Sequence, residues 1–218
     1  MPSSTRYPRQ GENLDFSRVM FFTDAVFAIA MTLLVVEIGV PETIDGAADD
    51  PAALLEVFDD KAPLIFAFFV GCYVIGSYWA AQHRFMSRLA AIDRGFVALT
   101  IVYLSFVALL PFPTGVLGEF AENPISVVAF AVNMGAVSTM EAVLFSHARR
   151  RRLLREEWPE DVYRWELRSS LSPVLLFALS VPVAFVLPQL GIVVWFLAIP
   201  FGMFLNRYRP KGAERYLT

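Results

Sequence analysis

Cysteine and histidine are scarce in this sequence, which limits the chemistry that it can support. Its 218 residues include one cysteine, Cys72, and two histidines, His83 and His147. A single cysteine cannot form an intrachain disulfide or a thiolate cluster, and the two histidines fall at the ends of different apolar segments. The sequence also lacks a glycine-rich phosphate-binding loop and a serine nucleophile elbow. We therefore expect no enzymatic activity, no cofactor, no metal site and no nucleic-acid partner.

Charged residues are also scarce, and hydrophobic residues are correspondingly abundant. Charged residues make up 18% of the chain and hydrophobic residues 56%, including 20 phenylalanines, whereas about a quarter of the residues of a soluble domain are charged. The charges collect between long apolar stretches instead of alternating with them. This segregation predicts an all-α integral membrane protein, in which each span needs about 20 apolar residues.

Six apolar stretches are candidates for membrane-spanning helices. They are Val19–Val40, Ala62–Ala81, Phe96–Leu117, Ile125–His147, Leu171–Leu187 and Leu190–Leu205. The last two are shorter and contain prolines, which neighbouring helices can accommodate in a membrane, so we expect a tight hairpin that turns at Pro188–Gly191. The first 18 residues are polar and the first apolar run is too long for a signal-peptide core, so we expect no cleavable leader.

The distribution of lysine and arginine predicts the orientation of the chain. Basic residues collect before the first span, after the second and fourth spans and in the tail, whereas the loops after the first and third spans are acidic. Both termini are therefore expected in the cytoplasm. The expected organisation is a cytoplasmic segment at 1–18, a six-helix membrane domain at 19–206 and a basic cytoplasmic tail at 207–218.

Two charged regions allow a second interpretation. The basic cluster of Arg149, Arg150, Arg151 and Arg152 either reports the topology alone or binds anionic lipid. The acidic outer loops either carry solvated charge or concentrate cations at the mouth of a pore. A third pattern, Val70–Tyr73 (Val-Gly-Cys-Tyr), faintly resembles a potassium selectivity filter, but it lies inside a span with no break before it. We interpret this tetrapeptide as helix packing and expect no re-entrant pore loop.

The first span carries two carboxylates and an apolar stripe between them. Asp24 lies near the expected cytoplasmic boundary and Glu37 near the outer one, so neither carboxylate needs to reach the bilayer centre, where its burial would be most unfavourable. At 100° per residue, one stripe contains Ile29, Leu33 and Val36, with Thr32 beside it. The residues that point elsewhere are Phe27, Ala30 and Leu34. An apolar stripe in a membrane helix is usually a helix-packing or lipid-facing surface, so the periodicity alone does not favour a pore wall.

Three segments resemble the transmembrane protein 175 family. Arg18, then Phe22-Thr23-Asp24 and the run AVFAIAMTLLVVEI are similar to the family's first-helix signature. Trp79 with His83-Arg84-Phe85 resembles the segment that closes its second helix, and Leu110–Thr114 (Leu-Pro-Phe-Pro-Thr) resembles a motif near the outer end of its third helix. The second half of the chain matches only in span count and length.

This resemblance implies a potassium-selective cation channel built without a re-entrant loop. A chain with one six-helix repeat would assemble as a homotetramer whose first helices line the axis, whereas the animal organellar members carry two repeats and form dimers. The permeant ion would be potassium, and the expected location is a bacterial plasma membrane.

The resemblance also assigns roles to particular residues. Ile29 would form a narrow hydrophobic constriction, Leu33 and Val36 would form apolar layers further out, and the hydroxyl of Thr32 would contribute to selectivity. A polar network at the cytoplasmic end would comprise Arg18, Thr23, Asp24 and His83. Two positions depart from the family pattern: Thr23 stands where serine is usual, and Val36 where leucine is usual, which shortens the outer apolar layer.

Other interpretations remain open on the residues alone. Arg18 and Asp24 form, in one interpretation, an ion pair that stabilises the helix and does not touch ions. A small secondary transporter would use the proline-broken last spans, and Glu141, near the inner end of the fourth span, is a further ionisable candidate. A non-conducting membrane scaffold is the third possibility.

Overall fold

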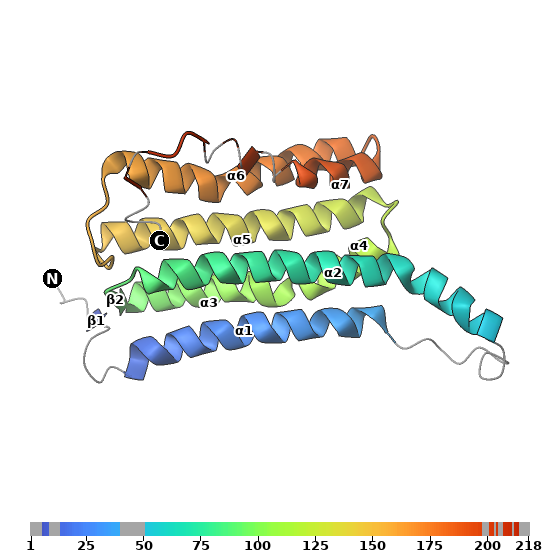
Figure 1. Cartoon of the computed structure of the whole chain (residues 1–218), viewed down its shortest axis with the longest axis horizontal. Coiled ribbons are helices and arrows are strands. Elements are labelled where there is room, and N and C mark those ends of the chain that lie inside the picture. Colours follow the sequence, from blue (N-terminus) through green and yellow to red (C-terminus); the bar gives the residue numbers. More distant parts are fainter. Residues whose placement is uncertain are drawn as a thin grey trace.

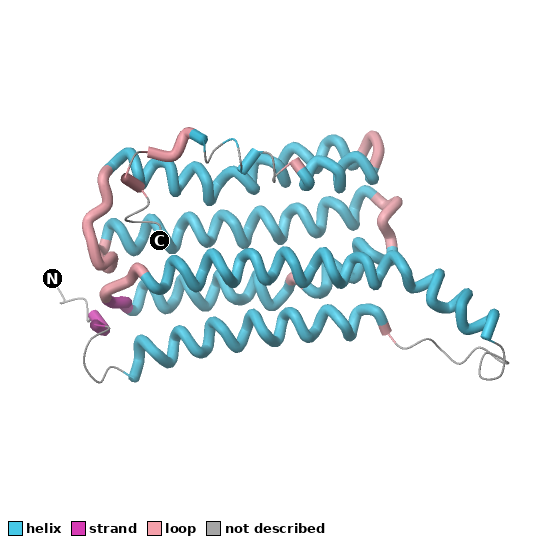
Figure 2. Tube along the Cα trace, in the orientation of Figure 1, coloured by secondary structure: helices cyan, strands magenta, loops and turns pink. Residues whose placement is uncertain are grey.

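The computed structural model describes residues 6–8, 14–39, 51–197, 201–202, 204, 207–210 and 212–213. Long helices lie side by side in this part of the chain, and a short two-stranded sheet lies at one end of the bundle (Figure 1 and Figure 2). The elements are β1 (Arg6–Pro8), α1 (Leu14–Ile38), α2 (Pro51–Ser87), β2 (Ala91–Asp93), α3 (Arg94–Leu109), α4 (Pro111–Glu119), α5 (Pro124–Arg150), α6 (Glu160–Ala184) and α7 (Pro188–Phe196).

The predicted helical membrane fold is confirmed in its main outline. Within the described residues, five helical segments are long and apolar enough to cross a membrane: Phe16–Ile38, Pro51–Ser87, Arg94–Glu119, Pro124–Arg150 and Glu160–Ala184. The expected sixth span, 190–205, falls partly outside the described residues. Its described part is α7, which has 9 residues. The acidic segment at 41–50 also lies outside the described residues, as does most of the tail.

Helix α2 begins earlier than the sequence analysis predicts. It starts at Pro51, not near Ala62, so Glu56, Asp59 and Asp60 lie on a helical extension and not in a loop. Proline is favoured in the first turn of a helix, and the Ala-Ala-Leu-Leu that follows Pro51 has high helix propensity. The helix then runs unbroken to Ser87 and contains Val70–Tyr73 in helical conformation.

The third expected span is divided into two helices. α3 ends at Leu109 and α4 begins at Pro111, with Leu110 between them. Proline lacks the N–H that would continue the ladder of an α-helix, which explains the break at this point. α4 packs against α1 and α2, and the Thr114 hydroxyl donates a hydrogen bond to the carbonyl oxygen of Leu110 at 2.8 Å.

The turn of the final hairpin was predicted in the wrong place. The connection between α6 and α7 is 185–187, and Pro188–Gly191 forms the first turn of α7. The reason is the same preference of proline for the first helical position. α6 also starts earlier than predicted, at Glu160, so part of the basic fourth loop is helical.

The helices pack in a consistent order. α1 contacts α2, α3 and α4; α3 contacts α5; and α5 contacts α6, which in turn contacts α7. α1 therefore lies on one side of the bundle and α6 on the other, with α5 between α6 and the α2–α3 pair (Figure 1).

Candidate pore-lining face of α1 and its supports

The two faces of α1 differ sharply in burial. The residues expected to point away from the stripe, Phe27 and Leu34, are each 1% exposed, and Ala30 is fully buried. On the stripe itself, Ile29 is 56% exposed and Val36 65% exposed. The prediction from periodicity, that these residues lie on different faces, is confirmed.

Close contacts hold the buried face of α1 in place. The ring of Phe27 lies 6.2 Å from that of Tyr103 on α3. Gly71 of α2 faces Leu34 so closely that a methyl group added there would lie 2.9 Å from Leu34 Cδ1. Glu37 approaches Gly115 of α4 in the same way, where an added methyl group would lie 2.5 Å from its carboxylate. These contacts fix α1 from one side and leave its apolar stripe uncovered in the single chain.

The uncovered stripe is longer than the sequence analysis predicts. Leu33 is exposed between Ile29 and Val36, and Phe22, seven residues before Ile29, is 54% exposed on the same side. The signal was present in the sequence, because residues seven positions apart lie within about 20° on a helix.

Thr32 also lies on the exposed side of α1. Its hydroxyl donates a hydrogen bond to the carbonyl oxygen of Ile29 at 2.8 Å. The hydroxyl proton is therefore used within the helix, and the oxygen lone pairs remain as acceptors on the exposed surface. This arrangement gives an otherwise apolar stripe one oxygen that can face a cation or its water.

At the inner end of α1, an indole and not an arginine hydrogen-bonds to Asp24. Trp79 Nε1 donates to a carboxylate oxygen of Asp24 at 2.9 Å, and the Trp79 ring lies 5.4 Å from the ring of His83. Asp24 and His83 also line the same small cavity between α1 and α2. This bond depends on how α2 packs on α1, which local spacing in the sequence does not reveal.

The other two residues of the expected network behave differently from each other. Thr23 is buried, lines the same small cavity and donates a hydrogen bond to the carbonyl of Val19 at 2.9 Å. Arg18 is exposed, and among the described residues no ion pair joins it to Asp24. The structure thus brings together Thr23, Asp24 and His83, and leaves Arg18 outside this group.

We expect Trp79→Phe to destabilise the protein more than Arg18→Ala does. The phenylalanine keeps the ring but removes the N–H that binds Asp24, a loss of about 1 kcal/mol for a hydrogen bond at a partly exposed site. The stability of both variants would be measured by thermal unfolding in detergent, monitored by light scattering because this signal does not depend on tryptophan. A larger loss for Arg18→Ala would show that Arg18 has a partner in the assembled protein, and would contradict this assignment.

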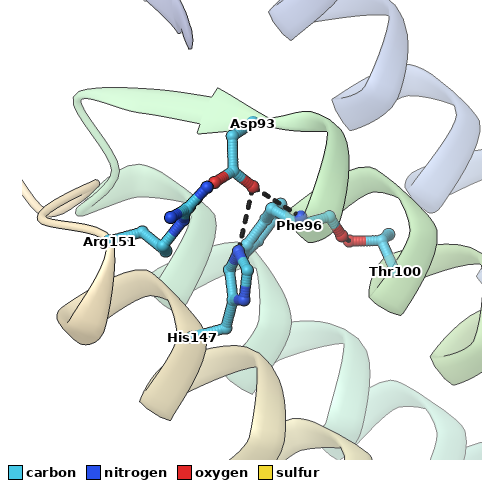
Figure 3. A network of polar contacts seen from close by, with 5 residues as sticks. All are labelled: Asp93, Phe96, Thr100, His147 and Arg151. Atoms are coloured by element: carbon cyan, nitrogen blue, oxygen red, sulfur yellow. Dashed lines mark hydrogen bonds and ion pairs between the residues drawn. The ribbon is translucent and has the colours of Figure 1, made fainter. Parts of the chain in front are cut away.

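A second polar group, which the sequence analysis did not predict, fixes the start of α3 to the end of α5 (Figure 3). The side chain of Asp93 is 4% exposed and accepts three hydrogen bonds: from the Phe96 amide at 2.7 Å, from His147 Nε2 at 2.9 Å and from Arg151 Nε at 3.0 Å. One turn further along α3, the Thr100 hydroxyl donates a hydrogen bond to the carbonyl oxygen of Phe96. An aspartate three residues before the first core phenylalanine is a typical N-cap signal, and this signal could have identified Asp93.

The charge environment of Asp93 favours its ionised form. Desolvation raises the pKa of this carboxyl group, but the hydrogen bonds from Phe96, His147 and Arg151, together with the charge of His147, outweigh it and lower the pKa. Asp93 is therefore a buried anion with cationic and N–H donors around it, which is the arrangement that stabilises a buried charge.

Intrachain contacts occupy part of the basic cluster. Arg151 bonds to Asp93, and Arg149 pairs with Glu160 at 2.5 Å and lies over the ring of Tyr163. Arg149 and Arg151 therefore have structural roles in the inner part of the bundle. Binding of anionic lipid by Arg150 and Arg152 stays a prediction.

Comparison with known proteins then identifies the family. The family model described as endosomal/lysosomal potassium channel TMEM175 matches residues 18–111, which include most of α1 and all of α2 and α3. A potassium channel of Chamaesiphon minutus is 34% identical to this chain over 145 residues, which make up 65% of this chain and 68% of that protein. The chain belongs to the TMEM175 family.

Further relatives extend the similarity to the whole TMEM175 fold. A potassium channel of Streptomyces collinus is 40% identical over 116 residues, or 53% of this chain, and this match spans about half, 54%, of that relative. The crystal structure of a lysosomal potassium-selective channel TMEM175 homolog from Chamaesiphon minutus superposes with a TM-score of 0.72 at 26% identity, covering 88% of this chain and 98% of that one. The TMEM175 fold therefore includes the second half of the chain, where no sequence motif was found.

Proposed function

We propose that this protein is a potassium-selective channel of the bacterial plasma membrane. The observation that carries the proposal is the uncovered apolar stripe on α1, which is fixed from the opposite side by α2, α3 and α4. Its relatives in Chamaesiphon and Streptomyces are named potassium channels, and TMEM175 is a family of channels and not of enzymes.

Four copies would place their α1 helices around a common axis, with the stripe facing inward. One chain supplies a single such helix and cannot enclose a pore alone. In the ring, Ile29 would form the constriction, with Leu33 and Val36 as wider layers further out. An apolar ring has no oxygen to replace the water that an ion sheds, so it controls flux by its radius and wetting. Thr32 would supply the nearby oxygen that contributes to selectivity.

In this proposal the polar groups at the inner end hold the pore helix and do not bind ions. Asp24 accepts a hydrogen bond from Trp79, and the Thr23 hydroxyl donates a hydrogen bond to the carbonyl of Val19 in its own helix. The expected orientation places both termini and the basic end of the bundle in the cytoplasm, without a re-entrant loop.

Mass measurement tests the assembly. We expect the detergent-solubilised protein to have the mass of four chains, because one repeat presents one pore-lining helix. Native mass spectrometry or light scattering combined with size-exclusion chromatography would provide the value. A stable monomer that retains full ion flux after reconstitution would refute the tetramer.

Liposome flux tests the activity and separates the alternatives. Purified protein in potassium-loaded vesicles should release potassium down its gradient, and faster than sodium, without a second coupling ion. A scaffold would give no flux above empty vesicles. A secondary transporter would give flux that depends on a coupling gradient, and either result would contradict the channel.

A further inference from the structure

A groove of about 900 Å³ runs along the side of the bundle away from the α1 stripe. One wall is α2, which packs on α1 and α4, and the other is formed by α5, α6 and α7, which pack on one another. This groove is not used by the channel proposed above. The residues that line it are charged at one end and uncharged along the rest of its length.

Charged side chains lie only at the inner end of the groove, where α2 ends and α6 begins. They are Arg84, Arg88, Arg209, Glu141 and Glu166. Arg88 bonds to Glu166 at 3.2 Å, and three guanidinium groups face two carboxylates, so this end carries a net positive charge. Arg84 is exposed and takes part in no ion pair among the described residues. Its charge attracts the carboxylate of Glu141, and its exposed guanidinium group can also meet an anion from outside the chain.

The rest of the groove is uncharged and mostly aromatic and aliphatic. Tyr73 on α2, Phe177 on α6 and Trp195 on α7 line it beyond the charged end, and the rings of Phe177 and Trp195 lie 5.8 Å apart. From Arg84 to Tyr73, α2 rises about 16 Å at about 1.5 Å per residue. This distance matches one leaflet, which is half of a hydrocarbon core about 30 Å thick.

We propose that this groove binds a phospholipid from the leaflet at the basic end of the bundle. Its phosphodiester would lie at Arg84 and Arg209, and one acyl chain would extend along Tyr73, Phe177 and Trp195. Guanidinium groups bind phosphate oxygens through charge-assisted hydrogen bonds. A helix of a neighbouring subunit would match the apolar part but would offer no phosphate to the excess positive charge at the basic end. The site is separate from the basic cluster at Arg149–Arg152.

The charge requirement can be tested on the purified full-length protein. Native mass spectrometry in the presence of phosphatidylglycerol or phosphatidylethanolamine should show one phospholipid retained per chain. Arg84→Gln should weaken its binding about tenfold, because it removes a charge-assisted contact and keeps a similar shape. Arg94→Gln, at an exposed arginine outside both the groove and the basic cluster, should change nothing. A greater loss of phospholipid binding with Arg150→Gln than with Arg84→Gln would locate the lipid at the basic cluster and overturn the proposal.

A pair of serines tests the shape of the groove. Ser77 lines the groove and Ser105 does not; both are exposed and donate to the carbonyl four residues earlier, at 2.7 and 2.9 Å. Ser77→Trp should fill the groove and abolish lipid retention, whereas the Ser105→Trp variant should retain the lipid. Equal retention in both variants would overturn the proposal. The proposal would also be overturned if the wild-type protein carries no phospholipid and Ser77→Trp breaks the tetramer, because a neighbouring subunit would then occupy the groove. The lipid count needs no ion flux, so its failure is distinct from failure of the channel.

Discussion

Ile29→Asn will raise cation current and reduce the preference for potassium over sodium. The ring of four Ile29 side chains is expected to resist wetting, and asparagine introduces an amide that holds water at the same position. A barrier lowered by about 1.4 kcal/mol would increase the current about tenfold. Planar-bilayer recordings under opposed potassium and sodium gradients would measure both current and reversal potential. Ile29→Ala should act in the same direction by widening the ring.

The opposite face of the same helix provides the control. Phe27 is buried against α3, so Phe27→Ala should destabilise the protein by about 3–5 kcal/mol and lower the yield, while the channels that do assemble keep their selectivity. Val35 is 54% exposed and lies off the stripe, so Val35→Ala should change neither the stability nor the selectivity. If the reversal potential is unchanged in the Ile29 variants, or shifts equally with Phe27→Ala, α1 does not line the pore at this position.

Asp93→Ala will cause the largest loss of stability among the polar substitutions. It removes the N-cap of α3 and leaves the Phe96 amide, His147 and Arg151 without their common acceptor. A lost cap and an unpaired buried donor together amount to about 2–4 kcal/mol, which corresponds to a fall in melting temperature of roughly 5–15 °C. Thermal unfolding in detergent at neutral pH would measure it.

Glu160 is a matched control for this prediction. It also accepts hydrogen bonds from two arginines, Arg149 and Arg164, but its side chain is 55% exposed. Exposed ion pairs contribute little because water screens them, so Glu160→Ala should change the melting temperature far less than Asp93→Ala. Equal effects would show that burial of Asp93 is not what makes its contacts important.

The pH dependence of stability provides a second measurement on Asp93. Its folded-state pKa is lowered from the ordinary value of 3.8, so the unfolded chain binds the proton more readily. The contribution of Asp93 is therefore complete above this ordinary value and is lost as the pH falls through the lower folded-state pKa. The difference in stability between wild type and Asp93→Ala should shrink over that acid range. A constant difference would contradict the assignment.

Some features followed from the sequence because they depend on local periodicity. The two faces of α1 were predicted from 100° steps alone, since Phe27 and Leu34 can reach the core only by turning Ile29 away from it. The break after Leu110 has a local cause in Pro111, but a long apolar run concealed it. Helix ends were less predictable at α2 and α6, where charged residues continue a helix beyond the apolar segment.

Contacts between elements distant in the sequence were not predictable in the same way. An ion pair between Arg18 and Asp24 is one interpretation of the sequence, yet Asp24 bonds to Trp79 because of the rotation at which α2 packs on α1. Asp93 meets His147 and Arg151 only after α3 and α5 have come together. Neither the rotation nor the pairing is encoded in a short stretch of residues, and both required the folded chain.

The exposed stripe on α1 also has a consequence for biosynthesis. Phe22, Ile29, Leu33 and Val36 are apolar, so a newly inserted chain can present them to acyl chains with no unpaired polar group in the bilayer. In the proposed tetramer, a single subunit would remain in the membrane as a folded bundle that does not conduct. The conducting path would come into existence only when the fourth copy closes the ring, and partial assemblies would not dissipate the ion gradients of the cell.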